Sequence, residues 1–109
     1  MVSKVIISPN AQQQLEDYVS YVLLEKGNPQ AAKSITEDAL ITRNRLLNIA
    51  DILRPLDDKD LAELGYRKIL FKSHDYLFIY RVVDNIAYVD ATYHQLQDYE
   101  NIFKSEILQ

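Results

Sequence analysis

The residues best suited to chemistry, or to binding an anion, lie in the second half of the chain. Residues 65–83 carry Arg67, Lys68, Lys72 and Arg81 against a single acid, Asp75, although the 109-residue chain as a whole has a net charge of −4. An anionic group is therefore expected to prefer this segment to the rest of the protein.

His94 follows these cations in the segment ATYHQLQDYENIF, residues 91–103. Histidine gains and loses a proton near neutral pH, so it can act as a base, an acid or a binding contact. The chain has no cysteine, which excludes thiol chemistry and thiolate metal sites. Asp90 and His94 would lie roughly 13 Å apart along one strand, too far to ligate one metal ion together. The other histidine, His74, falls in a turn and is expected to be solvated. The sequence therefore predicts neither a metal nor a cofactor.

The segments that hold these residues have the alternation of β-strands. They read YRKILFK, YLFIYRVV and IAYVDATY, and they are rich in the aromatic and β-branched residues that suit a pleated surface. Asp84-Asn85 suits a two-residue hairpin turn between the last two strands, because both residue types tolerate a positive φ. Such a turn pairs residue 83 with 86, 81 with 88, 79 with 90 and 77 with 92.

This pairing divides the side chains between two faces, since directly paired residues lie on the same face. One face is apolar and is the expected core: Tyr76, Phe78, Tyr80, Val82, Ala87, Val89, Ala91 and Tyr93. A loop around residues 73–76 sets 71 beside 78 and 69 beside 80, which keeps the apolar residues of the first strand inside and its lysines outside. The opposite face then collects Lys68, Lys72, Arg81, Tyr88, Asp90 and His94 beside Leu70, Leu77 and Ile79.

The second face mixes exposed apolar residues with cations, which indicates a surface for a partner. For Arg81 and Asp90 taken alone, a salt bridge between diagonal neighbours is the simpler explanation. Arg67 is expected to anchor the acidic connector or the C-terminus rather than to act in catalysis. Four tyrosines are expected to be core aromatics: Tyr66, Tyr76, Tyr80 and Tyr93.

Two helices are predicted to cover the apolar face. A short strand, VII, leads into the first helix, which Ser8 caps and Pro9 begins. Gly27 ends this helix, and Asn28-Pro29 starts the second in the same way. Because the turn between them is so short, the two helices must be antiparallel.

The second helix carries an apolar seam with steps of three and four residues, until Arg54-Pro55 stops it. An acidic connector at 55–65 follows, with one possible helical turn, and QDYENIFKSEIL can close the chain as a short helix. The order is β-α-α-β-β-β with a terminal helix. This predicts an α+β fold in which an α-helical hairpin packs on one face of an antiparallel sheet.

The length of the chain predicts a single domain, residues 1–109. No run of residues approaches the roughly 18 apolar residues of a membrane span, and the N-terminus does not have the pattern of a signal peptide. A cytoplasmic protein without a membrane partner is expected. The net negative charge argues against a strong non-specific grip on nucleic acid.

One combination of features points to a known family. A strand ending in Tyr80-Arg81-Val82 is followed by a two-residue turn, a valine-rich strand, His94, and then Asp98-Tyr99. Together with the order of a strand, a helical hairpin and a three-stranded meander, this resembles the RelE/ParE superfamily, the toxins of bacterial type II toxin–antitoxin pairs. The order of elements covers nearly the whole chain, and the more specific pattern covers about residues 66–100.

The resemblance implies a cytoplasmic poison that a cognate antitoxin neutralises. In the RelE-like branch the poison cleaves mRNA on the ribosome without a metal, by side chains that activate a hydroxyl, stabilise the phosphate and move a proton. That branch marks His94, Lys68, Arg81 and Tyr99 as candidate catalytic residues. The remaining polar residues of the second face become candidate binding residues: Lys72, Tyr88 and Asp90. In the ParE-like branch the toxin poisons DNA gyrase and cuts nothing itself.

Three departures set this chain apart from the nuclease pattern. Leu70 and Leu77 stand where the mRNA-cleaving members tend to place a lysine and an arginine, QLQ at 95–97 lacks an arginine, and the chain is acidic overall. Each missing donor to a developing phosphate charge would cost about 2–4 kcal/mol. The alternatives to a nuclease are a gyrase poison and a non-toxic module that binds an antitoxin but has lost the chemistry.

Overall fold

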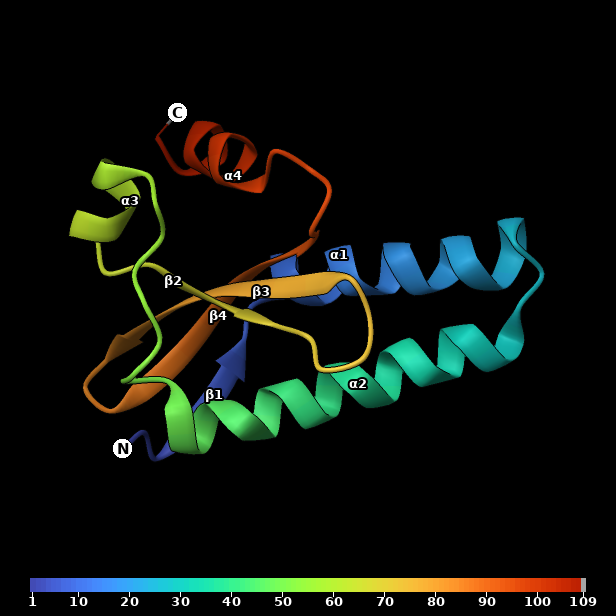
Figure 1. Ribbon diagram of the computed structural model, residues 1–109, viewed down its shortest axis with the longest axis horizontal. Helices are drawn as coiled ribbons and strands as arrows, with labels where there is room; N and C mark the ends of the chain where they lie inside the picture. The colour runs from blue at the N-terminus through green and yellow to red at the C-terminus, as the bar shows by residue number, and fades with distance from the viewer. Residues whose placement is uncertain (109) are drawn as a thin grey trace.

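The computed structural model describes residues 1–108 and contains one four-stranded sheet between two layers of helices (Figure 1). The strands are β1 (Lys4–Ile7), β2 (Arg67–Leu70), β3 (Tyr76–Val83) and β4 (Ile86–His94), in the spatial order β1-β4-β3-β2. The helices are α1 (Pro9–Ser20), the π-helical turn η1 (Tyr21–Glu25), α2 (Pro29–Ile49), α3 (Lys59–Glu63) and α4 (Tyr99–Ile107). The predicted α+β order is confirmed. β1 runs parallel to β4, so the sheet is antiparallel only across β4, β3 and β2.

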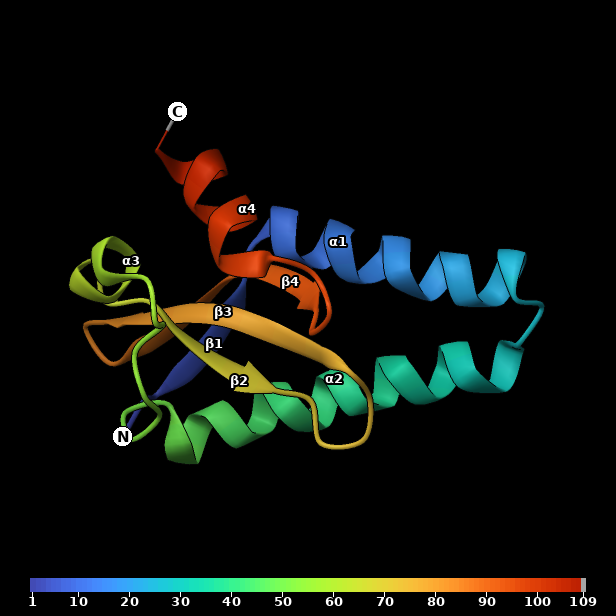
Figure 2. The same ribbon diagram turned by 45° about the horizontal axis from the view of Figure 1, so that its top comes forward.

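The predicted helical hairpin covers one face of the sheet, and its tip extends beyond the sheet (Figures 1 and 2). The Ser8 hydroxyl accepts a hydrogen bond from the Ala11 amide at 3.0 Å, and the Asn28 side chain accepts one from the Ala31 amide at 3.0 Å. Gly27 adopts a φ of +59° between the two helices. Both predicted caps and the predicted glycine break are confirmed.

The second helix ends earlier than its sequence predicts. α2 stops at Ile49, and the expected stop at Arg54 is wrong. The reason lies in the sheet: the Arg67 guanidinium donates to three carbonyl groups between residues 50 and 53, at distances of 2.7–3.4 Å. These carbonyl groups accept hydrogen bonds from the Arg67 side chain of β2 instead of from the amides of another helical turn. Arg67 is therefore an anchor, as expected, but for the segment directly after α2.

Tyr80 supports the same helix end from β3. Its ring is fully buried and its hydroxyl donates to the Ala50 carbonyl at 2.7 Å, while burial raises the pKa of this hydroxyl to about 12. We expect Tyr80→Phe to lower the free energy of unfolding by about 1 kcal/mol, because it removes the shorter of the two hydrogen bonds to the Ala50 carbonyl and leaves only the 3.4 Å contact with Arg67. Urea unfolding measures this change. Tyr21→Phe, at an exposed ring, is the matched control; equal stability of the two variants would contradict the prediction.

The β3–β4 hairpin has the predicted turn but not the predicted register throughout. Asp84 and Asn85 have φ values of 50° and 64°, and residues pair as expected from the turn as far as Tyr80 with Val89. A β-bulge at Asp90 then shifts the pairing, so that residue 79 pairs with 91 and 77 with 93. The expected pairs 79–90 and 77–92 are wrong, because a bulge adds one residue to β4 that nothing opposes on β3.

The bulge reverses the face that the later β4 residues occupy. Ala91 and Tyr93, expected against the helical hairpin, lie in a core on the other side of the sheet. Thr92 and His94, expected on the open side, lie on the side of the hairpin, where the Thr92 hydroxyl donates to the Ala11 carbonyl at 2.9 Å. One inserted residue therefore overturns four face assignments.

The β2–β3 pairing differs from the expected one by two residues. Ile69 pairs with Phe78, and Lys68 pairs with Ile79, whereas residue 69 was expected beside 80 and 71 beside 78. A shift by two residues preserves the faces, because side chains alternate with a period of two. Lys72, however, falls outside β2 and lies in the loop that leads to β3.

The face expected to be open holds a second apolar core beneath α3 and α4. Its buried residues are Leu56, Leu61, Tyr66, Leu77, Ile79, Ala91, Tyr93 and Phe103. The acidic connector closes this core, because the Glu100 carboxylate accepts hydrogen bonds from the amides of Asp57 and Asp58. Lys104 in turn forms ion pairs with Asp58 and Asp60 at 3.0 and 2.9 Å. The expected exposure of Leu77 and Ile79 is wrong, since both are fully buried.

Candidate functional site

Lys68 and Tyr99 form the part of the predicted site that the structure brings together. The Lys68 ammonium donates to the Tyr99 hydroxyl at 2.6 Å and lies 5.1 Å from the centroid of the same ring. β2 supplies the lysine and the first residue of α4 supplies the tyrosine. Within residues 1–108, neither side chain is hydrogen-bonded to a carboxylate or an imidazole. The pair can therefore bind an oxyanion, but it has no attached general base.

Arg81 and Asp90 form the ion pair that the sequence indicates. The Arg81 Nε lies 3.3 Å from an Asp90 carboxylate oxygen, and the guanidinium lies 5.7 Å from the centroid of the Tyr66 ring. Burial, followed by the nearby Asp90 charge, raises the pKa of Tyr66. Tyr88 pairs with Arg81 across the hairpin and with Ile6 of β1. This part of the sheet is a partly neutralised surface and not a free cluster of cations.

His94 lies apart from both groups. Its ring packs edge-on against Tyr76, with centroids 5.1 Å apart, and its Nδ1 accepts a hydrogen bond from the Leu96 amide at 3.1 Å. The Gln97 side chain accepts from the His94 amide and from the Tyr18 hydroxyl. His94 thus organises the turn after β4, on the opposite side of the sheet from Lys68. The expectation that it shares a face with Lys68 and Arg81 is wrong, because of the bulge at Asp90.

Lys72 and His74 are tied to α2 by a residue that sequence reasoning missed. The Asp38 carboxylate is buried and accepts hydrogen bonds from the amides of Lys72 and Ser73, at 3.2 and 2.9 Å. His74 Nδ1 lies 2.7 Å from the same carboxylate, so the expectation of a solvated histidine is wrong. A signal was present in the sequence, because Asp38 directly precedes Ala39 in the apolar seam of α2. The Asp38 carboxylate fixes the β2–β3 loop. The Lys72 side chain is left exposed, away from the other candidate residues.

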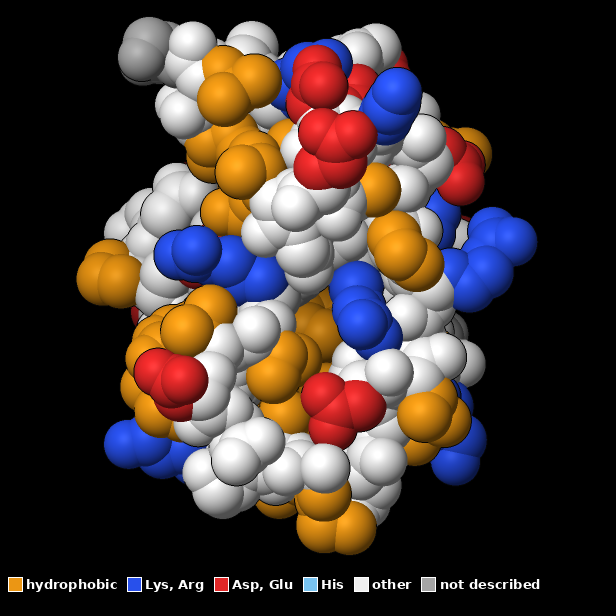
Figure 3. Space-filling model, turned by 90° about the vertical axis from the view of Figure 1, so that its left-hand side faces the viewer, with side chains coloured by type: hydrophobic (Ala, Val, Ile, Leu, Met, Phe, Trp, Pro, Cys, Tyr) orange, Lys and Arg blue, Asp and Glu red, His pale blue; other side chains and the backbone are white. Residues whose placement is uncertain are grey.

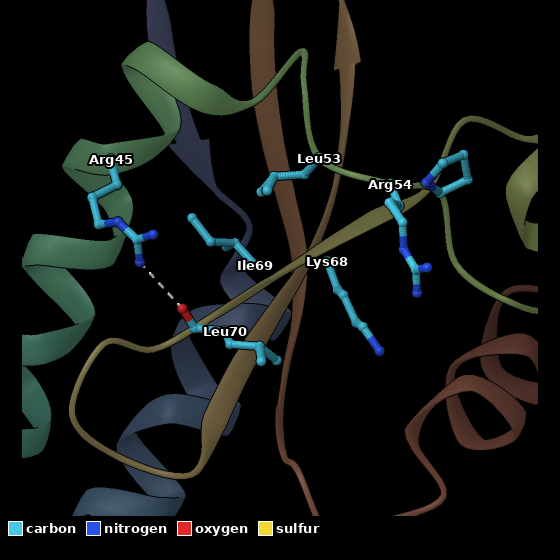
Figure 4. Close-up of a pocket in the computed structure, with 7 residues that line it drawn as sticks. Arg45, Leu53, Arg54, Lys68, Ile69 and Leu70 are labelled. Carbon is cyan, nitrogen blue, oxygen red and sulfur yellow. Dashed lines mark hydrogen bonds between the residues drawn. The ribbon is translucent and has the colours of Figure 1, made fainter.

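A groove beside the edge of β2 is the main cavity near these residues. It has a volume of about 320 Å³ and is lined by Arg45, Leu53, Arg54, Pro55, Lys68, Ile69 and Leu70 (Figure 4). Sequence reasoning missed Arg45 and Arg54. Arg45 lies near the end of α2 and Arg54 lies in the segment that follows it, and only the fold brings both residues close to β2. At the end of the molecule that holds α3 and the β3–β4 turn, basic side chains lie on either side of an apolar patch (Figure 3). Within residues 1–108, no three histidine or acidic side chains come together as metal ligands.

The architecture has a counterpart among solved structures. It is similar to a solved chain described as "Chromosomal ParDE TA system from P. aeruginosa", with a TM-score of 0.67 and 17% sequence identity over 84% of this chain and 94% of that chain. This likeness shows a shared fold. No curated protein matches the chain significantly.

The sequence itself matches a family model over residues 5–99, which is most of the chain. The model describes the ParE toxin of the type II toxin–antitoxin system, parDE. The chain belongs to this ParE toxin family and is the toxin component of a type II toxin–antitoxin system. A cognate antitoxin is therefore its partner. Within residues 1–108, no helix is both long and apolar enough to cross a membrane.

Proposed function

We propose that this toxin arrests growth by poisoning DNA gyrase and that it does not cleave mRNA. The observation that carries the proposal is the separation of His94 from Lys68 and Tyr99 by the sheet. Metal-independent RNA cleavage needs a base, an acid and a clamp for the phosphate around one bond. Among the described residues, 1–108, the sheet leaves Lys68 and Tyr99 as a pair with no base within hydrogen-bonding distance.

The neighbouring positions support the same proposal. Leu77 is fully buried in the second core, so this position cannot present a charge to a phosphate without disrupting the core. Arg81 is engaged by Asp90. Membership of the ParE family, named for the parDE system, favours gyrase as the target over the ribosome.

The test is induced expression in bacteria without the antitoxin, with growth, mRNA integrity and the state of DNA gyrase followed together. We expect growth arrest with intact mRNA and with accumulated gyrase–DNA cleavage complexes. His94→Asn is the informative variant, because the asparagine oxygen can replace Nδ1 as acceptor for the Leu96 amide but cannot titrate. We expect it to arrest growth as wild type does.

Two outcomes would contradict the proposal. Codon-phased mRNA cuts that disappear in His94→Asn or Lys68→Ala would establish the nuclease instead. Healthy growth at high expression of folded protein, which still co-purifies with its antitoxin, would establish a non-toxic binding module. A gene with an early stop codon is the control for the burden of expression.

A further inference from the structure

We propose that His94 is an acid-sensitive latch: protonation of its ring opens the turn at residues 94–97 and releases the start of α4 from the sheet. The inference depends neither on gyrase as the target nor on any catalytic role of His94. Three features carry it: Nδ1 is an acceptor, the described residues pair no carboxylate with the ring, and several segments meet at this turn.

His94 closes the 94–97 turn with three hydrogen bonds. Its Nδ1 accepts one from the Leu96 amide at 3.1 Å, and its carbonyl accepts one from the Gln97 amide at 3.1 Å. Its own amide donates to the Gln97 side chain at 2.9 Å. An imidazole nitrogen accepts a hydrogen bond only while it carries no proton. The turn therefore requires a neutral ring with its proton on Nε2.

Protonation of His94 changes this acceptor into a donor, because both nitrogens of an imidazolium carry hydrogen. The Nδ1–H group would then face the Leu96 N–H group with no acceptor between them, so either the ring or the turn must move. Histidine is the side chain that makes this change between pH 5 and 8. The hydrogen bond from Leu96 is therefore lost as the pH falls through this range.

The surroundings of the ring do not hold a proton on it. Among residues 1–108, no carboxylate lies within ion-pair distance of His94. β3 presents the Tyr76 ring, with centroids 5.1 Å apart, and α1 presents Tyr18. Burial raises the pKa of both tyrosines, so neither carries a negative charge at neutral pH. The acids adjacent to these contacts in the sequence are Asp17, Asp75 and Asp98.

The other histidine has the opposite arrangement. His74 Nδ1 lies 2.7 Å from the Asp38 carboxylate, which attracts a protonated ring. The hydrogen bonds that Asp38 accepts hold its pKa below the ordinary value, so the carboxylate stays charged while the histidines titrate. Acid therefore strengthens the contact at His74 and breaks the one at His94, which makes His74 an internal control.

The 94–97 turn joins the end of β4 to the β2–β3 loop and to α1 (Figure 2). The Gln95 amide donates to the Asp75 carbonyl at 2.8 Å, and the Gln95 side chain donates to the Tyr76 carbonyl at 3.3 Å. The Gln97 side chain accepts a hydrogen bond from the Tyr18 hydroxyl. Because these contacts come from consecutive residues of one turn, opening the turn disturbs them together.

α4 begins directly after this turn. The Asp98 carbonyl accepts a hydrogen bond from the Ile102 amide at 3.1 Å and so closes the first turn of the helix. Tyr99, the first residue of α4, holds the Lys68 ammonium at 2.6 Å. Phe103, one turn further on, is 2% exposed in the second core. Movement of the 94–97 turn is therefore expected to free Lys68 from Tyr99 while the rest of α4 stays in place.

The experiment follows the free toxin, made by cell-free synthesis, by NMR between pH 8 and pH 5. At pH 8 the His94 ring is expected to be neutral with its proton on Nε2. As the ring takes up a proton, the Leu96 amide resonance should shift with the same midpoint. The exchange protection of the Ile102 amide, corrected for the intrinsic effect of pH on exchange, should fall about five- to tenfold, the factor that corresponds to the loss of about one hydrogen bond.

Two variants at position 94 separate titration from packing. His94→Asn keeps an acceptor for the Leu96 amide but cannot titrate, so it should retain the protection of Ile102 at pH 5. His94→Ala lacks the acceptor and should show the lower protection at both pH values. His74→Asn is the matched control, because it removes the other titrating ring and should leave the response of Ile102 unchanged. Circular dichroism confirms that each variant is folded.

A His94 ring that titrates while the Leu96 resonance and the protection of Ile102 stay constant would overturn the inference. So would the same dependence on pH in His94→Asn as in wild type, or a proton on Nδ1 at pH 8. These measurements on the wild-type protein stand even if His94→Ala does not fold. None of them involves gyrase, so failure of the proposed target leaves this inference standing.

Discussion

Replacing Phe103 by alanine is expected to lower the free energy of unfolding by about 3–5 kcal/mol, the range for large aromatic side chains in a core. Phe103 is 2% exposed, and it meets the Tyr66 ring edge-on with centroids 4.8 Å apart. It is the one fully buried residue of α4, so the variant loses the largest apolar contact of this helix with the second core. Urea unfolding followed by circular dichroism measures the change.

Ile107→Ala is the matched control, because it removes an apolar side chain from the same helix at a position that is 37% exposed. We expect this control to cost less than about 1 kcal/mol, as surface substitutions generally do. If α4 detaches before the rest unfolds, amide exchange will increase first at Leu77 and Ile79, beneath it. A Phe103→Ala protein with the stability and exchange of wild type would show that α4 does not close the second core.

Replacing Asp38 by alanine is expected to lower the free energy of unfolding by about 2–4 kcal/mol. The change leaves the Lys72 and Ser73 amides and the His74 ring without their shared acceptor, in a place where Asp38 itself is 3% exposed. Each buried donor left unpaired costs about 1–3 kcal/mol, although exposed loop residues regain part of this from water. Glu37→Ala, one residue away on the exposed side of α2, is the control.

The same carboxylate predicts a dependence on pH. Burial alone would raise the pKa of Asp38, but the hydrogen bonds from His74, Ser73 and Lys72 and the attraction of His74 outweigh it and hold this pKa below its ordinary value of 3.8. The stabilisation is therefore complete above pH 3.8 and is lost as the pH falls through the lower folded-state pKa. The difference in stability between wild type and Asp38→Ala should narrow below about pH 4. A difference that stays constant through this range would contradict the assignment.

The order of the elements could be predicted because it depends on local signals. Caps at Ser8 and Asn28, the glycine break at Gly27 and the Asp84-Asn85 turn act through a few adjacent backbone groups. The family resemblance rests on this same local pattern, and the family model that matches residues 5–99 confirms it.

The candidate site could be predicted only in part, because its geometry depends on pairing between distant segments. The chemical character of Lys68, Arg81 and Asp90 was evident from the sequence, as was the Arg81–Asp90 ion pair. The bulge at Asp90 could not be predicted from the sequence, since a strand with one extra residue has the same composition as a regular strand. Its effect is large because side chains alternate with a period of two, so that a single inserted residue moves His94 to the other side of the sheet.

The sequence by itself determined the elements, their order, the turn residues and the family, because each of these is specified by residue types at short spacing. Only the tertiary structure decided which polar residues meet. It separated His94 from Lys68, joined Lys68 to Tyr99, placed Asp38 under His74 and brought Arg45 and Arg54 to the edge of β2. These contacts join residues up to 36 positions apart in the chain. They arise from register and from the packing of α2, α3 and α4 on the sheet, which no local pattern of residues encodes.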